Sequence, residues 1–155
     1  MLHAHIKALI VALFLSTAFN ATASLAPGAS GAVMVEPLLR SGELEALCAE
    51  TIRPYYAARS SEAVERLTQA CRDPPLRIHR PEGAFFLWLW FPGLPITSQE
   101  LYRRLKARCV YVLSGHHFFP GLADDWRHRD ECIRINASQA PDSVAAGVQV
   151  IAEEV

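Results

Sequence analysis

The apolar positions predict one buried strand near the middle of the chain. Residues 84–91 read AFFLWLWF, an unbroken apolar run that is large and aromatic-rich after Ala84. Pro81–Gly83 precede this run, and Pro92 and Gly93 follow it. A short, aromatic-rich run between such residues is typical of a strand buried on both faces, whereas a membrane span needs about 20 apolar residues. We therefore expect a fully buried strand over 84–91.

Upstream of this strand, apolar residues recur every three to four positions, which predicts helix. The pattern extends from about Gly42 to Cys71, and Ser41 and Gly42 are predicted to end a preceding helix. A helix of that length would be about 45 Å long, too long for the core of a small domain. Pro54 should kink or split it. We therefore expect this long helix to be a spine that connects two separately folded parts of the protein.

Shorter elements are predicted downstream. Residues 76–79 and 133–136 have strand patterns, and 110–113 is apolar and rich in β-formers. Thr97 and Glu100 form a capping box, which predicts a helix to about Ala107. A final helix is predicted to begin at Pro141-Asp142, with the apolar stripe Val144, Val148, Ile151 and Val155. The expected fold class is α/β: a small sheet with flanking helices on a helical spine.

Composition limits the class of protein. The 155 residues include 15 basic and 16 acidic side chains, and 51% are hydrophobic. Such a chain is globular, and it has no basic excess that would indicate nucleic acid. We expect neither a nucleic-acid partner nor a membrane span.

The four cysteines lie far apart and form no C-x-x-C pair. Zinc ligands usually come in close pairs, so a structural zinc site is not expected. We interpret these residues as buried free thiols of a cytoplasmic protein.

Residues 1–23 have an alternative interpretation as a signal peptide. Lys7 precedes the apolar run 8–19, and Ala21–Ala23 fit the small-x-small pattern of a cleavage site. The protein would then be a small secreted binding module with two disulfides. Otherwise this segment is a buried apolar element of a larger domain.

Three segments carry a resemblance to a known family. They are RPEGAFFLWLWFPGLPITSQELYRRLKAR (80–108), SGHHFFPGL (114–122) and CIRIN (132–136). They resemble the C-terminal part of the valine–pyruvate aminotransferases, which are pyridoxal-phosphate (PLP) enzymes of fold type I. The resemblance implies amino-group transfer between valine or alanine and a 2-oxo acid. It also implies a small-domain sheet, a PLP cofactor in the intact enzyme, and a homodimer.

The same resemblance suggests a division of the chain. Residues 1–30 would be a remnant of the large domain or a signal-like segment. Residues 31–72 would form the spine, and residues 73–155 the small domain.

Arg134 is the first candidate site residue. A guanidinium offers two parallel N–H donors that match a carboxylate. The resemblance implies that Arg134 binds the substrate's α-carboxylate, although an arginine in a strand can also be structural.

The resemblance implies that the loop Gly115, His116, His117, Phe118 and Phe119 borders the pocket for the substrate side chain. Core packing is the alternative. The paired histidines could suggest a metal, but we expect neighbouring side chains to diverge, and no carboxylate lies at ligand spacing. No metal site is predicted.

The resemblance also implies that the turn Pro81, Glu82 and Gly83 faces the cofactor cleft. Two positions depart from the family pattern, which has glycine at Cys109 and proline at Ser114. Glycine often holds a positive φ, so Cys109 should cost about 1 kcal/mol or more there.

No catalytic residue is predicted on this chain. PLP transamination requires a lysine that forms a Schiff base with the cofactor. Lys7 lies in the unmatched N-terminal segment, and Lys106 lies on the exposed face of the helix predicted to end at Ala107. We expect no cofactor-binding lysine and no catalysis by the chain alone. A further alternative is a subunit that pairs with a separately encoded large domain, or that associates through exposed apolar surface.

Overall fold

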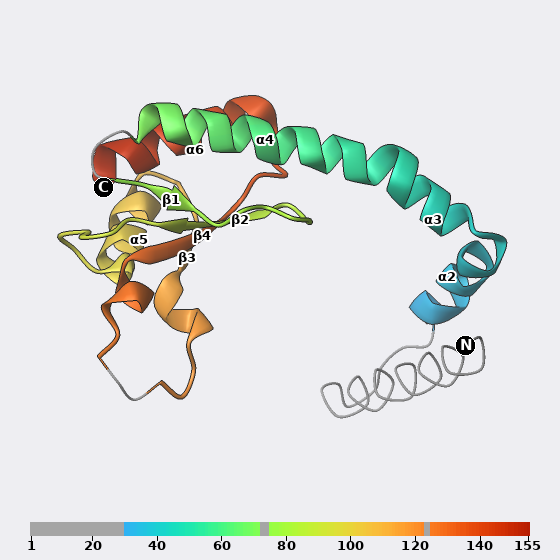
Figure 1. Ribbon diagram of the computed structural model, residues 1–155, viewed down its shortest axis with the longest axis horizontal. Coiled ribbons are helices and arrows are strands. Elements are labelled where there is room, and N and C mark those ends of the chain that lie inside the picture. Colours follow the sequence, from blue (N-terminus) through green and yellow to red (C-terminus); the bar gives the residue numbers. More distant parts are fainter. Residues whose placement is uncertain (1–29, 72–74, 123–124) are drawn as a thin grey trace. The chain divides into compact units, whose positions relative to one another are not determined.

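A computed structural model describes residues 30–71, 75–122 and 125–155 (Figure 1). The chain divides into two units, Met1–Ala46 and Leu47–Val155, which we describe separately. The signal-like run and Lys7 lie outside the described residues. The predicted division at residues 30 and 72 stays a prediction. No helix in the described ranges is both long enough and apolar enough to cross a membrane.

In the first unit, helix α2 (Ser30–Ser41) ends where the sequence predicted. Gly42 follows with φ of +79°, a conformation that glycine adopts without a steric penalty. The N–H of Glu43, at the start of the next helix, donates to Ser41 Oγ at 3.4 Å. This turn separates α2 from α3 (Glu43–Leu47).

The predicted spine is divided, as Pro54 indicated. Helix α3 ends at Leu47, a π-helical segment η1 spans Cys48–Ile52, and α4 spans Arg53–Ala70. Pro54 is therefore the second residue of α4. Its missing N–H falls where the wider π-helical turn joins α4, next to Arg53, whose N–H donates to the carbonyl of Cys48.

The second unit contains a four-stranded antiparallel sheet with the order β1-β2-β4-β3. The strands are β1 (Arg77–Ile78), β2 (Phe86–Trp90), β3 (Leu113–Ser114) and β4 (Cys132–Asn136). The predicted strands at 76–79 and 133–136 are confirmed. The segment 110–113 contributes only Leu113, so most of the strand predicted there is absent.

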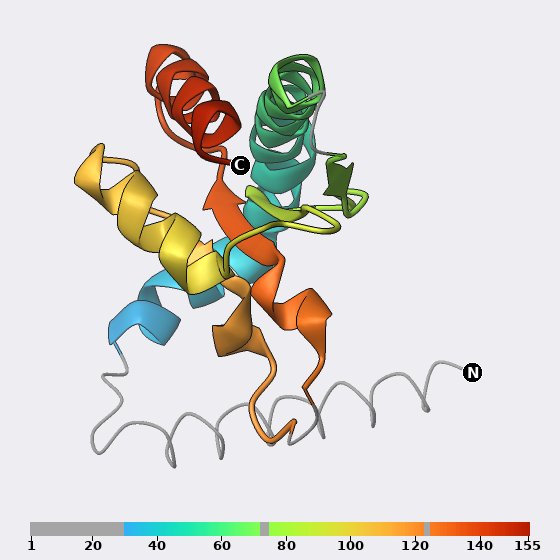
Figure 2. The ribbon, with the colours of Figure 1, turned by 90° about the vertical axis from the view of Figure 1, so that its left-hand side faces the viewer.

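Three helices cover one face of the sheet (Figure 2). They are α4, α5 (Ser98–Ala107) and α6 (Pro141–Glu154). Thr97 caps α5 by accepting the N–H of Glu100 at 3.2 Å, which confirms the predicted cap, whereas the Glu100 side chain pairs with Arg103 and Arg104. The core residues buried between the helices and the sheet include Leu67, Leu87, Leu89, Leu101, Leu105, Ile133 and Ile151. The predicted stripe of α6 lies in or against this core.

The prediction that β2 is buried on both faces is wrong. Leu87 and Leu89 are buried, whereas Phe86, Trp88 and Trp90 on the opposite face are partly exposed. Two short 3₁₀ turns contact this face: η2 (Gly115–Phe118), which follows β3, through Phe118 and Trp88, and η3 (Arg127–Asp130), which precedes β4, through His128 and Trp90. The alternation of buried and exposed positions was not visible in the sequence, because the side chains on both faces are apolar. Aromatic residues occupy the less covered face of β2, and aliphatic residues occupy the core face.

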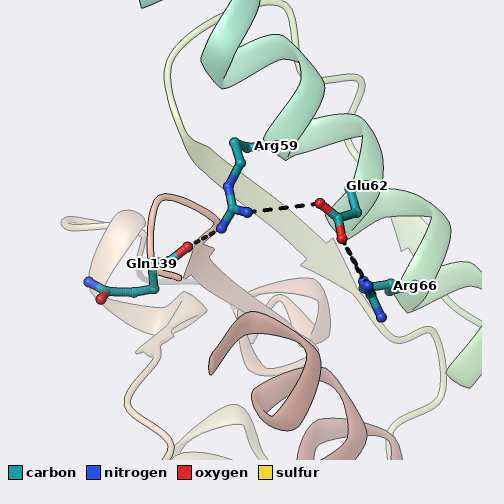
Figure 3. Close-up of polar contacts among 4 residues, drawn as sticks. All are labelled: Arg59, Glu62, Arg66 and Gln139. Carbon is teal, nitrogen blue, oxygen red and sulfur yellow. Dashed lines mark hydrogen bonds and ion pairs between the residues drawn. The ribbon is translucent and has the colours of Figure 1, made fainter. Parts of the chain in front are cut away.

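Arg59 connects α4 with the segment that precedes α6 (Figure 3). Its Nη2 donates to the carbonyl of Gln139, and its Nη1 lies 3.9 Å from Glu62, which pairs with Arg66 at 2.8 Å. Only 10% of the Arg59 side chain is exposed, and its Nε has no partner among the described residues. The contact therefore fixes α4 against the start of α6.

The cysteines differ from the prediction in burial. All four are free thiols, but only Cys71 and Cys132 are buried. Burial raises the pKa of the Cys132 thiol to about 12. Cys48 and Cys109 are exposed, so the interpretation of four buried thiols is wrong for these two.

Candidate functional site

Arg134 lies at the centre of the sheet, on strand β4. It pairs with Trp88 of β2 on one side and with Leu113 of β3 on the other. Its neighbours Ile133 and Ile135 point into the core, so Arg134 points to the face without helices. The Arg134 Cζ lies 4.2 Å from the centroid of the Phe86 ring and 4.8 Å from that of Phe118.

The N–H donors of the Arg134 guanidinium are unoccupied in the residues that the structure describes. Within the described part of the chain, no side chain or carbonyl accepts a hydrogen bond from it, and no carboxylate pairs with it. A guanidinium has five N–H donors, and two of them can bind both oxygens of a carboxylate. The position predicted from the sequence therefore has a geometry that can bind an anion.

Aromatic residues surround this arginine and form what we call the aromatic face: Phe86, Trp88, Trp90, Phe118, Phe119 and Trp126. The ring of Trp88 lies 5.0 Å from Phe118 and 6.0 Å from Phe119, both edge-on. The loop residue Phe118 thus lies beside Arg134, and Phe119 lies beside Trp88 and Trp126. Sequence reasoning did not assign Trp88 to this site, because it placed β2 in a fully covered core, and it made no prediction for Trp126.

Gly115 has a structural role at the start of η2. A Cβ on this residue would lie 2.6 Å from the carbonyl oxygens of both Arg129 and Cys132. Because both atoms belong to the backbone, they cannot move aside cheaply. Gly115 thereby permits the close approach that places Phe118 beside Arg134.

The paired histidines of this loop do not diverge, contrary to the prediction. His116 and His117 lie in the 3₁₀ turn η2, and their ring centroids are 3.8 Å apart. Burial and the neighbouring His117 lower the pKa of His116. No cluster of three or more potential metal ligands occurs in the described residues.

Ser114 belongs to a buried polar chain. Its Oγ lies 2.7 Å from Ser98 Oγ of α5 and 2.7 Å from His116 Nδ1. Ser98 also donates to the carbonyl of Arg129 at 3.3 Å. The Ser114 hydroxyl therefore provides hydrogen bonds that a proline would lack, although the Ser114 φ of −67° would also suit proline.

The turn Pro81–Gly83 lies at a separate place. It lines a cavity of about 500 Å³ together with Cys48, Ile52 and Tyr56, and Arg134 is not among the lining residues. Ala84, next to the turn, has φ of +59°, a strained conformation for a residue with a Cβ. The structure therefore does not bring this turn and Arg134 into one cavity.

Aromatic contacts nevertheless link the two places. The ring of Phe85, which lines the cavity, lies 5.3 Å from Tyr56 and 4.6 Å from Phe86. Phe86 in turn contacts Arg134. The cavity and Arg134 are therefore connected through the contact between the Phe85 and Phe86 rings.

Glu131 is a buried charged residue that sequence reasoning missed. It accepts hydrogen bonds from Trp90 Nε1 and from the N–H of Gly93, both at 2.9 Å, and it pairs with Arg127 at 2.8 Å. Burial raises its pKa, but these hydrogen bonds and the Arg127 charge outweigh burial, so the pKa is lowered. Glu131 holds the end of β2 against the start of β4.

Cys109 confirms the expected positive φ, at +61°. The N–H of Cys109 donates to the carbonyl of Lys106 at 3.0 Å, and the N–H of Val110 donates to the carbonyl of Leu105 at 2.9 Å. This pair of bonds is the Schellman motif that ends many helices, usually with glycine at the position of Cys109.

Lys106 does not fit a role as the cofactor lysine. It lies on the exposed side of α5, with its Nζ 5.9 Å from the centroid of Tyr102. No other lysine lies in the described residues. These residues therefore do not fit PLP as a covalently bound cofactor, and we derive no step through it.

Comparison with known proteins identifies relatives. No protein-family model matches the chain. The chain is 42% identical over 139 residues to the valine–pyruvate aminotransferase of Escherichia coli (strain K12), covering 90% of this chain and 33% of the relative. The crystal structure of valine–pyruvate aminotransferase from Salmonella typhimurium LT2 superposes with a TM-score of 0.79 at 42% identity, covering 89% of this chain and 36% of that one.

The fold is shared more widely. An α-aminoadipate aminotransferase from Thermus thermophilus has a TM-score of 0.63 at 23% identity, covering 77% of this chain and 29% of that one. The chain spans about one third of the length of the relatives it matches. Over about nine tenths of its own length the chain is therefore similar to part of a valine–pyruvate aminotransferase, and its fold is that of the fold type I aminotransferases.

Proposed function

We propose that this chain provides the substrate-carboxylate site of a valine–pyruvate type transaminase. Arg134 binds the α-carboxylate of the amino acid or 2-oxo acid through paired N–H donors. The aromatic face contacts the branched apolar side chain. The observation that carries this proposal is the Arg134 guanidinium, held by two rings with its donors free, in a chain 42% identical to a valine–pyruvate aminotransferase.

The catalytic groups would come from elsewhere. PLP supplies the electron sink for transamination when it is bound. The cofactor lysine and the phosphate-binding groups would lie in the two thirds of the family protein that this chain does not span. We therefore propose that the chain alone is catalytically incomplete.

Carboxylate binding tests this proposal without any need for turnover. Isotope-labelled protein is titrated with 3-methyl-2-oxobutanoate, the 2-oxo acid of valine, and the Nε–Hε signal of Arg134 is followed by NMR. We expect a saturable shift that Arg134→Lys weakens at least tenfold, because lysine keeps the charge but loses the planar donor pair. Arg77→Lys is the matched control, because Arg77 also lies over a ring of the sheet, 5.1 Å from Trp90. Equal binding by the wild type and Arg134→Lys would refute the proposal.

A second candidate function is pairing with a separately encoded large domain. Helix α2 exposes Val33, Met34, Leu38 and Leu39, with 75% of Met34 accessible. Such apolar surface is typical of an interaction site. Co-purification of the tagged chain with a PLP-binding protein would support this function, and a stable monomer without such a partner would contradict it.

A further inference from the structure

Two rings from different segments contact the Arg134 guanidinium. Phe86 belongs to β2 and Phe118 ends η2, and their centroids lie 4.2 and 4.8 Å from the Arg134 Cζ. Both distances are within the range of about 6 Å in which a ring face attracts a cation. The two contacts thus restrict the guanidinium from two independent parts of the fold.

A contact between the guanidinium and a ring differs from an ion pair because it leaves the N–H donors of Arg134 unoccupied. A carboxylate neighbour would engage the N–H donors of Arg134, and a ligand would have to displace it. A ring face attracts the cation through its quadrupole, while the N–H bonds lie in the guanidinium plane. The rings can therefore orient Arg134 and leave its donors available.

The rings are themselves held by the fold. Trp88, the cross-strand partner of Arg134, meets the Phe118 ring edge-on at 5.0 Å, and the Phe85 ring lies 4.6 Å from Phe86. Gly115 fixes the start of the turn that carries Phe118. The positions of both rings are set without a ligand.

We propose that Phe86 and Phe118 are positioning residues for Arg134. They hold the guanidinium at the aromatic face with its donor pair directed to a substrate carboxylate. This inference rests on the proposed function. It assigns a role to Phe86, which sequence reasoning treated as core, and a more specific role to Phe118.

The test uses the same titration of the full chain with 3-methyl-2-oxobutanoate. Phe86→Leu and Phe118→Leu should each weaken binding about threefold. Each should also shift the free Arg134 Nε–Hε signal, because a ring current is lost. Phe118→Tyr should retain both the affinity and the shift. Tyr111→Leu, which removes a ring that is 71% exposed, is the control and should change neither.

The outcomes separate this inference from the proposed function. If the wild type binds 3-methyl-2-oxobutanoate through Arg134 and both leucine variants bind it with the wild-type affinity, the positioning role is refuted and the proposed function stands. If the wild type shows no binding that depends on Arg134, both fail. The amide NMR spectrum of each variant shows whether that variant is folded. Phe86 is 40% exposed, so Phe86→Leu tests the role even if Phe118→Leu does not fold.

Discussion

At the scale of single residues, Cys109 occupies a position that favours glycine. Its φ of +61° costs a residue with a Cβ about 1 kcal/mol or more, and the thiol is exposed, so little packing offsets this cost. Cys109→Gly should therefore raise the free energy of unfolding by about 1 kcal/mol in urea denaturation. Cys109→Ala keeps the Cβ and is the control. Equal stability of the two variants would contradict a strained Cys109.

Glu131 should make stability depend on acid pH. Because its pKa is lowered in the folded state, its contribution is present above the unfolded pKa and is lost as pH falls through the folded value. Glu131→Gln should lose about 2 kcal/mol at pH 7 and show a smaller drop in melting temperature between about pH 5 and 3. Asp130→Asn, which alters the neighbouring carboxylate, is the control. An unchanged acid slope in Glu131→Gln would refute this assignment.

At the scale of elements, the turn η2 depends on Gly115. An alanine there must displace backbone atoms 2.6 Å away, so Gly115→Ala should destabilise the protein by about 2–3 kcal/mol in chemical denaturation. Gly147 in α6 has no atom within 4 Å of a built Cβ. Gly147→Ala should instead stabilise by about 0.5–1 kcal/mol, since alanine is the better helix former. If both variants were equally stable, the close packing at Gly115 would be wrong.

Local signals predicted the helices well. The capping residue Thr97, the glycine at residue 42 and the prolines at 54 and 141 mark helix ends through backbone chemistry, which does not depend on distant contacts. The predicted position of Arg134 on a strand between core residues followed from the alternation of its neighbours. The positive φ of Cys109 followed from the family resemblance.

The exposed face of β2 could not be predicted in the same way. Which face of a strand is covered depends on where α4, α5 and α6 pack, and the run FLWLW is apolar on both faces. The same limit applies to Glu131, whose partners Trp90 and Gly93 lie 41 and 38 residues away in sequence. Burial of the cysteines was misjudged because Cys48 lies in the exposed π-helical segment of the spine and Cys109 lies in the turn that ends α5.

At the scale of the whole molecule, the chain combines the proposed carboxylate site at Arg134 with exposed apolar side chains. Exposed apolar side chains occur in α2 and at Leu47, Ile52 and Tyr55. The relatives are about three times as long as this chain. Both observations agree with our proposal that catalysis requires parts of the family protein beyond those the chain spans.

The most direct test of this account is treatment of the purified chain with PLP, followed by borohydride reduction and peptide mass analysis. We predict no absorbance band above about 400 nm at stoichiometric PLP, no site-specific adduct, and no alanine formation from valine and pyruvate. Lys106→Arg provides the control for incidental modification. A stoichiometric adduct on Lys106 that is absent in this variant, together with turnover, would contradict the account.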